Sequence, residues 1–155
     1  MWTYSGSTGA ITPQVGNTSV PSNWTLDAVD AGIGKIKEFY WGGGATTSTA
    51  MHTRVSRASG EVGGQTTGNV SEYGGADQPA NKVNFVTSYA TTHPTLDAAD
   101  IFSMSWNAHG GVVRWLADPD EEIWVQTGQT LDLITCKNTV GTATSSYGVI
   151  WSEFS

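Results

Sequence analysis

The chain has 155 residues, the length of one domain whose hydrophobic core is large enough to fold without disulfides. Charged residues make up 14% of the sequence, and 14 acidic residues against 7 basic ones give a net charge of −7. Nucleic acids and anionic membranes are bound by clusters of lysine and arginine, so this balance argues against both as direct partners. No apolar run approaches the roughly 18–20 residues of a membrane span.

The first 31 residues differ from the rest of the chain, because glycine and proline recur through them and interrupt any regular period. We predict an extended N-terminal arm over residues 1–31, anchored by Trp2, Tyr4 and Trp24, and one β-sandwich domain over residues 32–155. Two alternatives are open for the arm: it packs on a neighbouring subunit, or it is a loose segment.

Beyond the arm, apolar and polar residues alternate with the period of β-strands, and glycine, threonine and serine fill the turns between them. The predicted strands cover residues 33–41, 50–58, 82–90, 101–106, 112–116, 121–126, 129–137 and 147–154. Residues 59–81 form a long Gly-rich loop, with room for a short strand near Val70 and for a partner contact. About eight strands with one long excursion predict an all-β fold: a single jelly-roll-like antiparallel β-sandwich.

The clearest pattern lies between Asp100 and Ile123. Phe102, Met104 and Trp106 alternate with polar or smaller residues, and residues 112–116 are again mostly apolar. Between these strands, residues 107–111 include two glycines that can take positive φ at little steric cost. We therefore predict a hairpin here, at the centre of the core.

Catalytic and metal-binding patterns are weak in this sequence. The three histidines, His52, His93 and His109, are far apart and lack the spacing of zinc ligands. The acidic residues of turn 118–122 could supply oxygen ligands to Ca²⁺, although a solvated turn is the simpler interpretation. Cys136 lies in an apolar alternating run and is expected to be a buried thiol. We expect no cofactor and no enzymatic activity.

The seven tryptophans raise a second hypothesis, since aromatic rings stack on sugars. Trp106, Trp115, Trp124 and Trp151 fall within strand patterns and are predicted to fill the core or a subunit interface. Trp2, Trp24 and Trp41 are less constrained by any pattern. The alternative function is therefore a carbohydrate-binding or host-attachment β-sandwich module of a tail or head fibre.

Three segments together resemble small structural proteins of tailed bacteriophages, of the capsid decoration (cement) type: Tyr40–Gly43 with Ser48–Arg54, Ser105–Trp115, and Gly141–Trp151. The ending of the last segment, Ser146–Trp151, is also similar to the last strand of trimeric jelly rolls, in which a Tyr/Phe-Gly step lies near the threefold axis.

The resemblance implies a structural virion protein on the capsid exterior, a homotrimer that binds and stabilises the major capsid protein. The residues expected at a partner or subunit interface are Trp2, Tyr4, Trp24, Trp41, Tyr147 and Trp151.

Overall fold

The structure is a computed structural model that describes residues 1–16, 21–60, 65–74, 78–88, 93–127 and 132–154. All regular secondary structure within these ranges is β-strand, and they contain no helix long and apolar enough to cross a membrane. The strands are β1 (Trp2–Ile11), β2 (Trp24–Ala28), β3 (Ile33–Gly43), β4 (Ala50–Ser59), β5 (Thr66–Thr67), β6 (Val70–Glu72), β7 (Val83–Ser88), β8 (Thr95–Asn107), β9 (Val112–Leu116), β10 (Ile123–Gln126), β11 (Leu133–Val140) and β12 (Ser145–Glu153).

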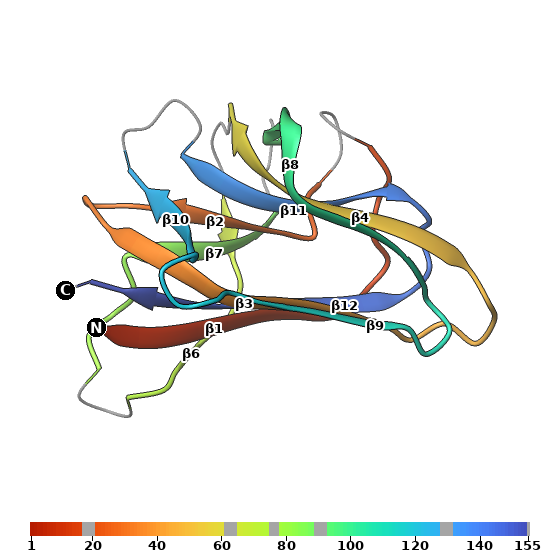
Figure 1. Cartoon of the computed structure of the whole chain (residues 1–155), viewed down its shortest axis with the longest axis horizontal. Coiled ribbons are helices and arrows are strands. Elements are labelled where there is room, and N and C mark those ends of the chain that lie inside the picture. The colour runs from red at the N-terminus through yellow and green to blue at the C-terminus, as the bar shows by residue number, and fades with distance from the viewer. Residues whose placement is uncertain (17–20, 61–64, 75–77, 89–92, 128–131, 155) are drawn as a thin grey trace.

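These strands form two antiparallel sheets packed face to face (Figure 1). Sheet A has the order β10-β3-β12-β1-β6, and β9 pairs with β3 beside β10. Sheet B has the order β5-β7-β2-β11-β4-β8. The prediction of an all-β antiparallel sandwich is therefore confirmed.

Eight of the strands pair as a long hairpin rolled up on itself. β1 pairs with β12, β2 with β11, β3 with β9, and β4 with β8, so partners are nested inside one another along the chain. Contacts of β3 with β12 and of β4 with β11 join the two halves of the roll. This nesting is the jelly-roll arrangement expected from the sequence.

The predicted central hairpin is wrong, although both of its strands exist. β8 pairs with β4 in sheet B, where Trp106 lies opposite Met51, while β9 pairs with β3 in sheet A, where Trp115 lies opposite Phe39. The turn after Asn107 therefore carries the chain from one sheet to the other. Alternation identifies a strand but does not identify its partner. β8 is an edge strand and is mostly exposed, so it does not form the centre of the core.

The predicted arm also needs correction, because the residues of β1 and β2 lie inside the sheets. β1 is flanked by β12 and β6, and β2 by β11 and β7. Gly6 had suggested an irregular segment, but it is a packing position: a Cβ atom there would lie 2.4 Å from the Phe85 ring. Gly9 has φ 64° within a register shift between Ser7 and Ala10, so its glycine serves a bulge inside a continuous strand.

A buried polar cluster lies inside the sandwich, among the aromatic core residues. The Asn138 side-chain oxygen accepts hydrogen bonds from Asn23 Nδ2 (2.9 Å), Thr53 Oγ1 (3.0 Å) and Tyr147 Oη (3.0 Å). Its amide nitrogen donates to the Gly141 carbonyl at 3.1 Å. These bonds connect β4, β11 and β12 with the residue just before β2, so the cluster fixes both sheets to one another.

Candidate functional site

Five of the six aromatic residues predicted at an interface are buried in the core, at most 1% exposed. They occupy inward-facing positions of β1, β2, β3 and β12, where Tyr4 stacks on Trp151 with ring centroids 5.9 Å apart. Side chains this deeply buried present almost no surface to a protein partner, so the interface prediction needs correction at Trp24, Trp41, Tyr147 and Trp151. Tyr4 is as deeply buried but lines the cavity described below. Trp2 alone of the six is partly exposed, and it lines the same cavity.

In the acidic turn 118–122, Glu122 is already engaged by basic side chains. Lys37 Nζ donates to Glu122 Oε1 at 2.5 Å, and Lys35 Nζ lies 3.6 Å from Oε2. The hydrogen bond from Lys37 holds the pKa of Glu122 below its usual range. Within the described ranges, no group of three or more His, Cys, Asp or Glu side chains is arranged to hold a metal ion.

The histidines do not converge. His52 Nδ1 lies 2.5 Å from Thr139 Oγ1 on the outside of sheet B. His109 Nδ1 lies 3.0 Å from the Ala45 carbonyl, at the corner where the chain passes between sheets. Cys136 is fully buried, as predicted, and burial raises the pKa of its thiol.

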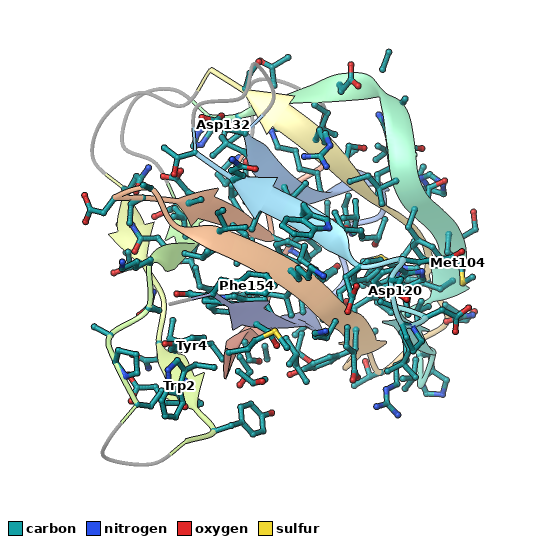
Figure 2. The ribbon with its side chains drawn as sticks, turned by 60° about the vertical axis from the view of Figure 1, so that its left-hand side comes forward. Trp2, Tyr4, Met104, Asp120, Asp132 and Phe154 are labelled. Carbon is teal, nitrogen blue, oxygen red and sulfur yellow. The ribbon has the colours of Figure 1, made fainter. Side chains whose placement is uncertain are left out.

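One side of the sandwich is formed by β8 in sheet B and by β9 and β10 in sheet A, and the outer edges of these strands pair with no other strand among the described residues. We call this side of the sandwich the open side. β8 is 13 residues long, and its second half, residues 101–107, carries no charged side chain. Met104 faces the interior by its register with buried Thr53, yet it is 42% exposed because no further strand covers it (Figure 2). Val112 and Leu116 on β9 add further exposed apolar surface.

A cavity of about 170 Å³ lies at the other end of sheet A. We call it the aromatic cavity. Figure 2 shows Trp2 and Tyr4 on β1, and Phe154 just after β12, at this end of the sheet. Among the residues that the structure describes, the lining is Trp2, Tyr4, Pro79, Ala80, Lys82, Glu153 and Phe154.

Sequence reasoning missed Glu153 and Phe154, although a signal was present. The inward positions of β12 are Tyr147, Val149, Trp151 and then Glu153, so a carboxylate continues an apolar alternation. A charged residue at an inward strand position indicates either a buried hydrogen-bonding role or a ligand site.

The outer face of sheet A carries a second exposed aromatic feature. The rings of Trp124 and Phe154 stack with centroids 5.8 Å apart and planes 12° apart. Lys35 Nζ lies 4.5 Å from the Trp124 ring centroid, within the range of a cation–π interaction. Both rings are more than 40% exposed, so part of their surface is open to a ligand.

No protein-family model matches this chain, and no curated protein or solved structure is similar to it. The function is therefore argued from the fold and from these surfaces.

Proposed function

We propose that this chain is a structural virion protein, a decoration protein that binds the major capsid protein on the outside of a phage head and stabilises it. The jelly-roll pairing supports this proposal, because it is the architecture that the resemblance implies. The three segments that carry the resemblance also meet at one end of the roll. There, the Gly43 and Gly44 amides donate to the carbonyls of Gly111 and Thr144, both at 2.9 Å.

The open side is the observation that carries the proposal. A long strand edge presents unpaired N–H and C=O groups to which another chain can add, and proteins usually protect such edges with charges, bulges or short strands. The first half of β8 has such protection, with Asp97, Asp100 and two register shifts. Residues 102–106 have none, so this half of the edge suits a protein that assembles.

We further propose that the oligomer is a homotrimer that uses the open side. A threefold ring needs two different surfaces that fit each other, because its contacts are heterologous. The open side provides two, the edge of β8 and the edge of β9 with β10, and they belong to different sheets. A twofold dimer would instead pair β8 with β8 of the second copy.

Light scattering during size-exclusion chromatography, over a range of concentrations, tests the oligomer. The proposal predicts a mass near three times 16.4 kDa. A mass of two chains would replace the trimer by a dimer, and a strictly monomeric protein would contradict self-assembly. Sedimentation of the protein with undecorated phage heads then tests capsid binding, and absence from the head pellet would contradict the decoration role.

The outer aromatic pair favours one alternative, a carbohydrate-binding or host-attachment module. Trp124 and Phe154 expose ring surface on which a pyranose could stack, with Lys35 beside them as a hydrogen-bond donor. Binding to a glycan array that is lost in Trp124→Ala would support this function. Silence on the array, with unchanged tryptophan fluorescence on adding sugars, would reject it.

A further inference from the structure

The aromatic cavity has the size and walls of a site for one small group. Its volume of about 170 Å³ is close to that of an engineered apolar cavity of roughly 150 Å³ that holds benzene. Trp2, Tyr4 and Phe154 supply aromatic surface on its walls. The Tyr4 hydroxyl donates to the Pro79 carbonyl at 2.8 Å, which fixes the tyrosine ring against the segment that leads into β7.

The cavity also contains a carboxyl group that lacks a basic partner among the described residues. The Glu153 carboxylate is almost fully buried and accepts hydrogen bonds from the Lys82 amide (2.7 Å), the Val83 amide (3.0 Å) and Trp151 Nε1 (2.8 Å). All three donors are neutral, and in the described part of the chain no basic nitrogen lies within 4.0 Å of this carboxylate. The Glu153 carboxylate therefore lies at the cavity wall with neutral hydrogen-bond donors as its partners.

Nearby carboxylates also act on the neighbouring Tyr4 hydroxyl. Burial is the main cause that raises the pKa of Tyr4, and the negative charges of Glu153 and Glu72 raise it further. Faces of aromatic rings add negative electrostatic potential, which attracts cations.

We propose that the aromatic cavity binds an alkylammonium group, with the cation over the rings of Trp2, Tyr4 and Phe154 and its charge balanced by Glu153. This inference goes beyond the proposed function and does not rest on it. A neutral group of the same shape would fill the volume but would gain nothing from the carboxylate. Two sources can present this chemistry: a small quaternary ammonium compound, or the lysine side chain of a protein partner.

Replacing Lys82 tests whether the bound group is positively charged. Its side chain is exposed at the cavity rim, and only its backbone amide bonds Glu153. Its ammonium group repels an incoming cation through solvent, so Lys82→Gln should tighten cation binding by roughly two- to fivefold. The same change should leave the binding of a neutral ligand nearly unaffected, and an exposed side chain can be replaced without loss of the fold.

The experiment is a calorimetric titration at low salt of choline, compared with 3,3-dimethylbutan-1-ol, its neutral carbon analogue. Choline should bind saturably and at least roughly tenfold more tightly than the alcohol. Trp2→Leu should weaken choline binding by roughly five- to thirtyfold, and Glu153→Gln should weaken it further. Met104→Leu, an exposed position on the open side and away from the cavity lining, is the control and should bind choline as the parent does.

Two further arms complete the test. A Gly-Lys-Gly peptide that binds more tightly than choline would identify a protein side chain as the natural source, and the reverse order would identify a small ligand. If Glu153→Gln does not fold, Lys82→Gln tests the role of charge in binding and Phe154→Leu tests the role of the aromatic rings. Equal binding of choline and the alcohol, or unchanged choline binding in both Trp2→Leu and Lys82→Gln, would overturn the proposal.

Discussion

The two sides of the sandwich end in very different ways. On one side the outermost strands are β5 and β6, which are two and three residues long. On the open side the outermost strands are β8, with 13 residues, and β9 together with β10. Short edge strands offer few unpaired backbone groups, so the first side is protected against pairing with another chain and the open side is not.

This difference supports the proposal that the open side is the surface that meets a partner. The strands of the open side are held mainly by their pairing with β3 and β4. They are also held at the corner where two connections, residues 44–49 between β3 and β4 and residues 108–111 between β8 and β9, pass from one sheet to the other. At the corner, the Ala108 amide donates to the Thr49 carbonyl and the Ala45 amide donates to the Ala108 carbonyl. The predictions below test this corner, the edge, the two halves of sheet B and its centre.

The largest effect is expected at Gly43 in the corner. A Cβ atom there would lie 1.9 Å from the Ala108 carbonyl oxygen, which is part of the backbone and cannot move alone. Gly43→Ala should therefore lower the free energy of unfolding by about 3 kcal/mol or more, measured by urea denaturation. Gly44→Ala is the control, since its nearest neighbour would be 3.7 Å away, and it should cost less than about 1 kcal/mol. Equal losses of unfolding free energy in the two variants would mean that these two connections are not tightly packed against each other at Gly43.

The next effect concerns assembly through the edge. Met104→Lys places a charge on the unprotected half of β8, which is how natural proteins block edge pairing. Light scattering should show the oligomer dissociating at least roughly tenfold more readily, with little change in the thermal midpoint. Tyr73→Lys, an exposed position next to β6, is the matched control and should keep the parent mass. An oligomer that survives Met104→Lys unchanged would move the contact elsewhere.

The contributions of two carboxylates in sheet B to the free energy of unfolding should change with pH in opposite directions. Burial opposes ionisation of Asp100 on β8, but hydrogen bonds from Arg54 and Ser56 outweigh it and hold its pKa below the usual range. Burial raises the pKa of Asp27 on β2, although Gln65 Nε2 donates to it at 2.7 Å. The ionised form is therefore favoured by folding at Asp100 and disfavoured at Asp27.

Asp100 adds stability above the unfolded carboxyl pKa of about 4, and this is lost as pH falls through its lower folded pKa. Asp27 adds stability below that pH, and this is lost as pH rises through its raised folded pKa. At pH 7, Asp100→Asn should destabilise by about 0.5–1 kcal/mol, whereas Asp27→Asn should not destabilise. Urea denaturation from pH 7 to 3 measures both, and parallel profiles for the two variants would contradict the assignment.

The smallest effect is expected at Cys136, in the centre of sheet B between the two sides. It is the one cysteine of the chain, and burial raises its thiol pKa far above the ordinary value. A thiol-specific disulfide reagent at pH 8 should react only at the rate of global unfolding. Fast labelling of the folded protein would show that one side of the sandwich opens readily. That result would weaken the comparison between the open side and the side that ends in β5 and β6.

The sequence was sufficient for the fold class but not for the pairing of strands. Period-two alternation identified β3, β4 and β9 because each buries one face more than the other. It identified β12 from the alternating large residues Tyr147, Val149 and Trp151. It could not show that β8 and β9 belong to different sheets, because a turn of five residues serves a hairpin and a crossover equally well. Glycines misled the interpretation of residues 1–31: Gly6 accommodates the Phe85 ring, so a missing side chain indicated packing instead of irregularity.

The candidate sites were harder to predict for a related reason. A sequence shows that Tyr147 and Trp151 are apolar and aromatic, but burial depends on which face of β12 meets the other sheet. The aromatic cavity joins residues from both ends of the chain and from residues 79–82, so only the folded pairing of β1 with β12 brings them together. The inward charge at Glu153 was the one local indication.

Hydrogen exchange of the β8 amides tests the central claim, that the open side is covered by another copy of this chain. The amides of residues 102–106 should become protected as concentration rises through the range where the mass changes from one chain to three, while those of β5 and β6 stay unchanged. If residues 102–106 exchange at the same rate in the monomer and the oligomer, or if no oligomer forms, the open side is not the assembly surface.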